Sequence, residues 1–205
     1  MNERVLIPPT DQIEIINRPK ASGPPDQYLP YKPGPDGVAP MASLGDGYWP
    51  HITGLTHDER GYPVMEPWAQ EQMINRLVRK IRDNAQRITS YETMFMDDAE
   101  VVVVAYGISY RSAKRAVAVA RELDVKAGLI KLNTVWPFPD DFFRDLAGQV
   151  KAMVMPEINQ GQIARELTRT VAGGCTGKSV PHCGGTIIRP ATIVSAMVEA
   201  IKERS

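Results

Sequence analysis

The sequence predicts an α/β domain on an open, mainly parallel sheet with helices on both faces, preceded by an extended proline-rich segment and a long helix. From residue 97 to 205, apolar runs of strand length alternate with helix-period segments, which is typical of parallel sheets with right-handed crossovers. Eleven of the 17 prolines lie in residues 1–66, where missing backbone donors disfavour regular helices and central strands. We therefore divide the chain into a lead-in of residues 1–66, a connecting helix over 67–96 and the α/β domain of 97–205.

The lead-in is expected to be extended and rich in turns. Unlike a disordered linker, it carries aromatic residues that need a surface to lie on, namely Tyr28, Tyr31, Tyr48, Trp49 and Tyr62. Disorder of the isolated lead-in is the alternative. Pro67 suits a first helical turn, and apolar residues then recur at helical spacing as far as Ile88.

The α/β domain begins with residues 101–105, an unbroken run of valine and alanine that is typical of a strand covered on both faces. Gly107 marks the turn that follows this strand. Pro137 and Pro139 lie beyond the second strand, and Gly173 lies just beyond the third helix. The expected later elements are helix 112–123, strand 126–132, helix 140–146, strand 151–155, helix 162–171, a short strand within 176–180 and helix 191–203.

The charge balance limits the partners that the chain is expected to have. Lysine plus arginine and aspartate plus glutamate both number 24, so we expect neither a nucleic-acid surface nor an anionic-membrane surface. No apolar run approaches the roughly 20 residues that span a bilayer, and the start is unlike a secretory signal. Two cysteines are too few for a disulfide scaffold or a four-cysteine cluster, so a reduced cytoplasmic protein is expected.

Residues 51–63 (HITGLTHDERGYP) concentrate polar side chains in one short loop. One interpretation is a polar site that presents His57, Asp58 or Glu59. The other is a hydrogen-bonded turn that anchors the lead-in. The residues alone leave both interpretations open.

Residues 157–162 (EINQGQ) lie between the third strand of the domain and its helix. Loops at the carboxyl ends of parallel strands face the ligand crevice, so Glu157 and Asn159 are placed to touch a ligand or a partner. Capping of the helix by Asn159 is the alternative.

Three loose motifs lack the context that their chemistry needs. Residues 172–179 match a loose phosphate-binding loop, but that loop must join a strand to a helix and here a helix precedes it. Residues 45–47 (GDG) with Asn75 imitate a thiamine-diphosphate motif without the buried strand before it. Residues 175–183 offer two cysteines and a histidine but no fourth zinc ligand. We therefore assign no catalytic, cofactor-binding or metal-binding residue.

Four segments together resemble the α subunit of 2-oxoacid:ferredoxin oxidoreductases of the 2-oxoglutarate or 2-ketoisovalerate type. These are residues 51–63, 101–107 (VVVVAYG), 136–139 (WPFP) and 157–162, in the order that the family has them. The resemblance covers the C-terminal, transketolase-C-like domain and the segment that leads into it. It implies that the chain is a fragment without a complete active site, with Met1 an internal start, and that it is inactive alone.

The resemblance also implies the setting of the chain. The parent complex decarboxylates a 2-oxoacid on thiamine diphosphate, reduces ferredoxin through an iron–sulfur cluster and releases an acyl-coenzyme A, with magnesium as the metal. The expected partners are the N-terminal pyrimidine-binding domain of the same subunit, a β subunit, ferredoxin through the complex, and a second copy in a homodimer. This chain itself is expected to bind no cofactor. The candidate residues at interfaces or near the active site are His51, Thr53, His57, Asp58, Glu59, Glu157, Asn159 and Gln162.

Two other functions stay open at this point. The chain could be a stand-alone small-molecule enzyme with its site in the crevice of residues 157–162. It could also be a nucleotide-binding module that uses residues 172–179.

Overall fold

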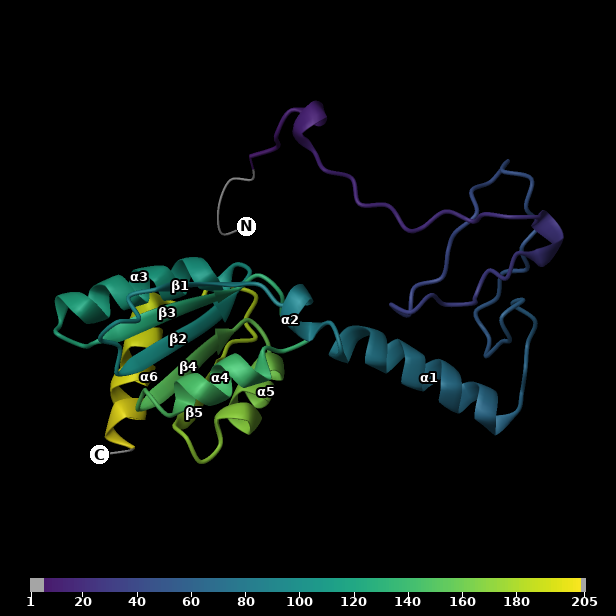
Figure 1. The fold of residues 1–205 in the computed structure, drawn as a ribbon. Helices are drawn as coiled ribbons and strands as arrows, with labels where there is room; N and C mark the ends of the chain where they lie inside the picture. The colour runs from purple at the N-terminus through teal and green to yellow at the C-terminus, as the bar shows by residue number, and fades with distance from the viewer. Residues whose placement is uncertain (1–5, 204–205) are drawn as a thin grey trace. The chain divides into compact units, whose positions relative to one another are not determined.

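A computed structural model describes residues 6–203, which form two compact units (Figure 1). One unit is Leu6–Ala85, and the other begins at Gln86. The boundary at residue 85 lies inside the segment that the sequence assigns to a connecting helix. The smaller unit therefore contains the proline-rich lead-in together with the long helix.

The larger unit is built on a five-stranded sheet in the order β1-β3-β2-β4-β5. β1 runs antiparallel to β3, and the remaining neighbours are parallel. In the central strand, Val103 lies opposite Leu129 on one side and Val154 on the other. This confirms the open, mainly parallel sheet. The strands are β1 Tyr91–Met94, β2 Val101–Tyr106, β3 Ala127–Leu132, β4 Ala152–Glu157 and β5 Thr176–Pro181.

Helices cover both faces of the sheet, as Figure 1 shows. Val101 and Val103 belong to a core with α3 and α6, whereas Val102 and Val104 belong to a core with α4 and α5. Successive side chains of a strand point to opposite faces, so a strand buried on both sides is apolar at every position. This arrangement explains the unbroken valine run. The helices are α3 Ser109–Glu122, α4 Asp140–Ala147, α5 Gln162–Val171 and α6 Pro190–Lys202.

The connecting segment predicted over 67–96 is not one continuous helix, and its last residues are not helical. Helix α1 spans Pro67–Arg82, and a single short helix, α2, follows at Ala85–Ile88. The Asn84 side chain donates to the Lys80 carbonyl at 2.9 Å and so caps the end of α1. Residues 91–94 then form β1 and pair with β3 at the edge of the sheet. A strand of four residues has too short a pattern to be recognised from periodicity.

The smaller unit consists of turns, extended chain and α1. Short 3-10 turns lie at Thr10–Gln12 and Pro25–Gln27, and isolated bridges join Lys20 to Met41 and His57 to Pro63. The Tyr28 hydroxyl links two segments, because it donates to the Pro40 carbonyl and accepts from the Ala42 amide. The extended, turn-rich lead-in and the long helix are thus as expected.

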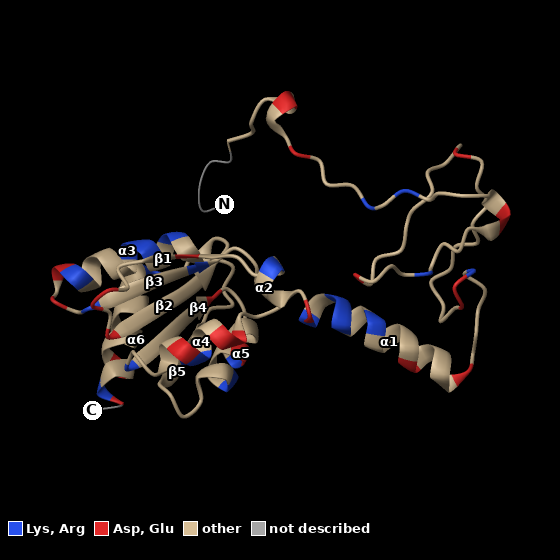
Figure 2. Ribbon diagram, viewed as in Figure 1, with Lys and Arg blue, Asp and Glu red and all other residues tan. Residues whose placement is uncertain are grey.

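Helix α1 carries opposite charges toward its two ends, as Figure 2 shows. Glu66 is its N-cap residue, and its last turn holds Arg79, Lys80 and Arg82. Cations near a helix C-terminus interact favourably with the helix dipole. Neither α1 nor any other helix in residues 6–203 is long and apolar enough to cross a membrane.

Candidate functional site

The first candidate cluster lies at the carboxyl edge of the sheet, between β2 and β4. The chain leaves β2 toward β3 and then returns past β2 to β4, so the strand order reverses between these two strands. In open α/β sheets ligands bind at such a reversal. Here the position is occupied by the side chain of Glu157, the last residue of β4, which is completely buried.

Both carboxylate oxygens of Glu157 accept hydrogen bonds from within the chain. Oε1 accepts from the Tyr106 hydroxyl at 2.8 Å and the Ile163 amide at 3.0 Å, and Oε2 accepts from the Ala164 amide at 2.8 Å. These amides belong to the first turn of α5. The amides of a first helical turn have no carbonyl partner within the helix, so they need another acceptor. A buried carboxylate is tolerated when donors surround it in this way.

Asn159 completes the same arrangement. Its Oδ1 accepts from the amides of Gly161 and Gln162 at 2.7 and 3.0 Å, and its Nδ2 donates to Glu157 Oε1 at 3.1 Å. Glu157 and Asn159 together therefore accept hydrogen bonds from the backbone amides at the start of α5. The capping interpretation of Asn159 accounts for these contacts. The side chain of Gln162 takes no part in this network, since only its backbone amide is used.

Tyr106 is a member of this cluster that the sequence analysis missed. It is the last residue of β2, and its hydroxyl donates to Glu157 and accepts from Asn159 Nδ2 at 3.1 Å. Burial, and then the neighbouring Glu157 carboxylate, raise the pKa of Tyr106 to about 12. The sequence could have indicated Tyr106 as a site residue, because it ends a buried strand that lies beside the strand ending in Glu157.

A titration tests this environment. In wild-type protein one phenol should ionise near pH 12, later than an ordinary tyrosine near pH 10, and Tyr106→Phe should remove that step from the absorbance at 295 nm. The folded state holds the Tyr106 proton more tightly, so Tyr106 favours folding below pH 10 and loses this contribution as pH rises to 12. Tyr62→Phe is the matched control, and it should leave the late step of Tyr106 in place. An unchanged late step in Tyr106→Phe would contradict the assignment.

The second candidate cluster is the loop of residues 51–63 in the smaller unit. Asp58 closes it, because its Oδ1 accepts from the amides of Arg60 and Tyr62 at 2.9 and 3.0 Å. The His51 Nδ1 lies 2.7 Å from the Gly61 carbonyl, and the His51 ring stacks on Tyr62 with centroids 4.8 Å apart. The loop is therefore a hydrogen-bonded turn, as the second interpretation of this segment requires.

Tyr31 fastens this loop to the rest of the unit. Its hydroxyl donates to the Thr53 carbonyl and accepts from the Thr53 amide, both at 3.1 Å. Its ring contacts the His57 ring with centroids 3.7 Å apart. Thr53 thus takes part through its backbone, and its hydroxyl accepts from the Leu55 amide at 3.1 Å. Tyr31 was noted for its aromatic ring but was not predicted as a site residue.

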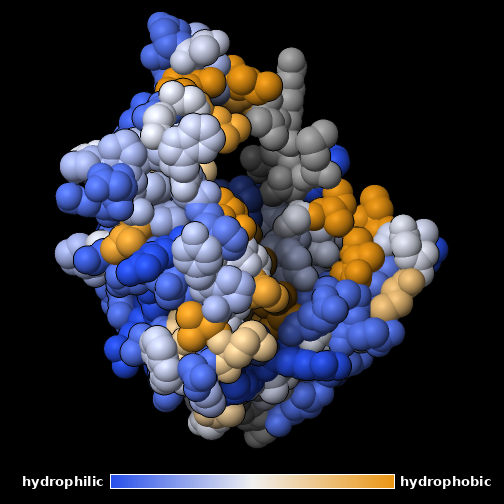
Figure 3. Space-filling view, turned by 90° about the vertical axis from the view of Figure 1, so that its right-hand side faces the viewer, coloured by the Kyte–Doolittle hydropathy of each residue, from blue (hydrophilic) through white to orange (hydrophobic). Residues whose placement is uncertain are grey.

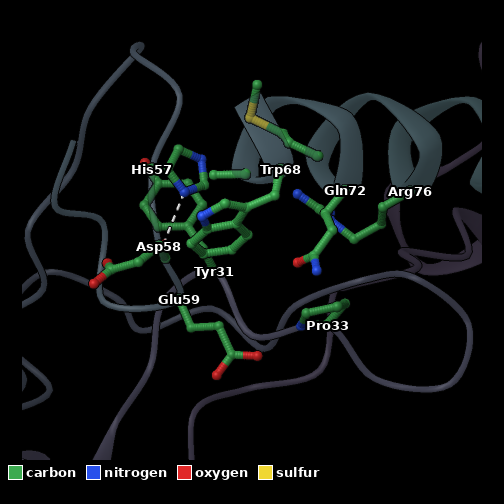
Figure 4. Close-up of a pocket in the computed structure, with 10 residues that line it drawn as sticks. Tyr31, Pro33, His57, Asp58, Glu59, Trp68, Gln72 and Arg76 are labelled. Carbon is green, nitrogen blue, oxygen red and sulfur yellow. Dashed lines mark hydrogen bonds between the residues drawn. The ribbon is translucent and has the colours of Figure 1, made fainter. Parts of the chain in front are cut away.

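A pocket of about 420 Å³ lies between this loop and α1 (Figure 4). His57, Asp58 and Glu59 line it from the loop, so three predicted residues share one cavity. Figure 4 shows the Asp58 carboxylate turned away from Trp68, in keeping with its bonds to its own turn. The other lining residues are Tyr31, Pro33, Trp68, Ala69, Gln72, Met73 and Arg76.

Residues 172–179 do not have the order of elements that the nucleotide-binding alternative requires. Helix α5 ends at Val171, and β5 begins at Thr176, so the order is helix to strand and no helix N-terminus follows the loop. Lys178 lies inside β5, where its ammonium contacts Glu203 at 2.6 Å and Glu199 at 3.2 Å. A phosphate-binding lysine needs the opposite order of elements.

Comparisons with known proteins agree with the fold. Residues 99–193 match the family described as pyruvate:ferredoxin oxidoreductase core domain II. A solved 2-oxoglutarate:ferredoxin oxidoreductase from Magnetococcus marinus superposes with a TM-score of 0.79 at 25% identity, over 95% of this chain and 34% of that chain. Together these matches define the chain as a relative of the 2-oxoacid:ferredoxin oxidoreductases.

Curated relatives identify particular subunits within that class. A 2-oxoglutarate synthase subunit KorA from Methanothermobacter marburgensis is 39% identical over 97% of this chain and 52% of the relative. The KorA subunit from Methanocaldococcus jannaschii is 42% identical, again over 97% and 52%. A ketoisovalerate oxidoreductase subunit VorB from Methanothermobacter thermautotrophicus is 35% identical over 62% of this chain and 35% of the relative.

These relatives confirm the resemblance seen in the sequence, which named both the 2-oxoglutarate and the ketoisovalerate types. The chain spans about half the length of the KorA relatives that it matches.

Proposed function

We propose that this chain acts as part of the α subunit of a thiamine-diphosphate-dependent 2-oxoacid:ferredoxin oxidoreductase, with 2-oxoglutarate as the substrate. The KorA relatives and the M. marinus enzyme, solved with 2-oxoglutarate, coenzyme A and succinyl-CoA bound, support this choice. The chain's own role would be structural. Its α/β unit is a scaffold, and its smaller unit is a contact element for other domains and subunits.

The observation that carries this role is how little of the smaller unit is buried. Of the described residues 6–85, only Ala39, Gly61 and Ala69 are buried. Large apolar side chains lie open at the surface, and Figure 3 shows several such patches in orange. Exposed apolar area on this scale marks an interaction surface. Examples are Ile16 at 87%, Leu44 at 105%, Trp49 at 94%, Ile52 at 69% and Met65 at 87% exposed.

The cofactors of the proposed complex would be held elsewhere. In residues 6–203 no group of three or more histidine, cysteine or acidic side chains is arranged to hold a metal ion. Cys175 is buried and Cys183 is exposed, and two thiols cannot supply the four that a cluster needs. We therefore assign magnesium and the cluster to other parts of the complex, and we expect the pyrimidine-binding domain and the β subunit to hold thiamine diphosphate and coenzyme A. The cytoplasmic location, ferredoxin contact and homodimer stay predictions.

Reconstitution tests the proposal. The purified chain alone should not reduce methyl viologen with 2-oxoglutarate and coenzyme A. The chain co-expressed with a pyrimidine-binding domain and a β subunit should do so, and omission of the chain should abolish the activity. Full activity of the two other components without this chain would contradict the proposed role.

Trp49 offers a sharper test of the contact surface. Its side chain is almost fully exposed, so Trp49→Ser should leave the far-UV circular dichroism and the unfolding midpoint unchanged. Buried tryptophans are frequent hot spots of interfaces, so association with the partner domains should weaken by roughly tenfold or more. Leu123→Ser, which removes an exposed apolar residue of the α/β unit, is the control for the measurement by biolayer interferometry. Equal weakening by both variants would contradict a contact role specific to the smaller unit.

A further inference from the structure

Aromatic side chains line one side of the pocket beside α1, and one of them, Trp68, is available to bind a ligand. Tyr31, His57 and Trp68 supply three rings, and Figure 4 shows them on the same side of the pocket. The Trp68 side chain belongs to the first turn of α1 and is 55% exposed. Its indole N–H has no hydrogen-bond partner in the described part of the chain. A tryptophan face is the strongest aromatic partner for a cation.

The net formal charge of the side chains that line this pocket is negative, since two are acidic and one is an arginine. The Glu59 carboxylate is exposed and makes no hydrogen bond or ion pair within residues 6–203. Asp58, by contrast, is held by its own turn. The one arginine in the lining, Arg76, donates to the neutral Gly37 carbonyl at 3.4 Å and keeps its positive charge, so the two carboxylates of Asp58 and Glu59 outweigh it by one charge. The pocket therefore offers an aromatic face and one available carboxylate, which is complementary to a cation.

We propose that this pocket receives a basic side chain, arginine or lysine, from a polypeptide partner. The proposal rests on the proposed contact role of the smaller unit and names the chemistry of one contact. A polypeptide fits better than a free cation because exposed apolar residues of the same loop, Ile52, Leu55 and Tyr62, extend the surface beyond the pocket. A partner segment would cover them while its basic side chain enters between Trp68 and Glu59.

A fluorescence titration of the full chain tests the recognition of a cation. Trp49 and Trp136 are 94% and 68% exposed, so replacing both by phenylalanine leaves Trp68 as the reporter in a folded protein. The probe is Nα-acetyl-argininamide, compared at equal ionic strength with Nα-acetyl-citrullinamide, which replaces the guanidinium by a neutral urea. The arginine probe should change Trp68 fluorescence saturably in the millimolar range, at least about fivefold tighter than the citrulline probe.

Variants of two acids separate the pocket from general electrostatics. Glu59→Gln should weaken the arginine probe about fivefold or more, whereas Glu71→Gln, on the exposed part of α1 outside the lining, should leave it unchanged. Equal binding of both probes, equal effects of both variants, or saturable binding of succinate instead would overturn the proposal. Circular dichroism of each variant confirms that α1 remains formed.

The titration contains no partner subunit, so it is independent of the reconstitution. Successful reconstitution with no response to the arginine probe would overturn the proposed basic side chain but support the contact role of the smaller unit. An arginine response without reconstitution would instead count against the proposed function.

Discussion

Glu157→Gln is expected to lower the free energy of unfolding of the α/β unit by about 3 kcal/mol, because hydrogen bonds to a charged group contribute roughly 1.5–3 kcal/mol and a buried group left without its partner is costly. The carboxylate accepts from Tyr106, Asn159, Ile163 and Ala164 and donates nothing. A glutamine amide has the same shape but must place an N–H₂ group against at least one of these donors. The substitution also removes a negative charge from the N-terminus of α5.

Urea unfolding followed by circular dichroism at 222 nm measures this loss. The matched control is Glu166→Gln, the same chemical change on the exposed side of α5. Glu166 pairs with Arg169 at 3.0 Å, and exposed pairs of this kind contribute about 0.5 kcal/mol or less. If Glu157→Gln lowers the free energy of unfolding by less than about 1 kcal/mol, the carboxylate does not hold the carboxyl end of β4 to the start of α5.

This result would also bear on the function of the sheet edge. The reversal of strand order is where an α/β sheet normally binds a ligand, and the sequence placed Glu157 and Asn159 there for that reason. The structure shows that their oxygens are used internally. A stand-alone enzyme with its site in residues 157–162 would need free polar groups at this point. The cluster is therefore better understood as part of the scaffold, whereas its assignment as an interface stays a prediction.

The sequence predicted the α/β unit well because burial on two faces leaves a local signal. The valine run of β2 and the helix-period segments between strands need no long-range information. β1 was missed because its four residues are mostly exposed and join the sheet only through β3. Tyr106 was missed because its meaning depends on Glu157, 51 residues later, and on the parallel pairing of β2 with β4.

The loop of residues 51–63 shows a different limit. Its residue types indicated a polar turn, but the partners that shape it come from Tyr31 and from α1, which no local pattern connects to it. The pocket beside α1 was unpredicted for the same reason. Trp68 fitted a helical pattern, and nothing in that pattern showed that its ring would face His57 and Glu59.

Gly61→Ala is expected to open this loop. Gly61 has φ of +93°, which side-chain-bearing residues rarely adopt, and an added Cβ would lie 2.2 Å from the His51 carbonyl oxygen and 2.9 Å from Tyr31 Cε2. His51 and Tyr31 both make contacts that keep the loop of residues 51–63 closed, so neither can move without breaking those contacts. In hydrogen exchange measured by mass spectrometry, peptides covering 56–64 should exchange at least about tenfold faster, since loss of local structure of about 1.4 kcal/mol gives that factor.

Gly54→Ala is the matched control, because it lies in the same loop with no atom within 4 Å of an added Cβ and no positive φ. It should leave exchange unchanged, as should peptides of the α/β unit in both variants. If the loop is the contact element that we propose, Gly61→Ala should also weaken association with the partner domains while Gly54→Ala does not. Faster exchange with unchanged association would show that the turn only stabilises the smaller unit. Unchanged exchange in Gly61→Ala would show that the close approach of His51, Tyr31 and Gly61 does not hold the loop closed.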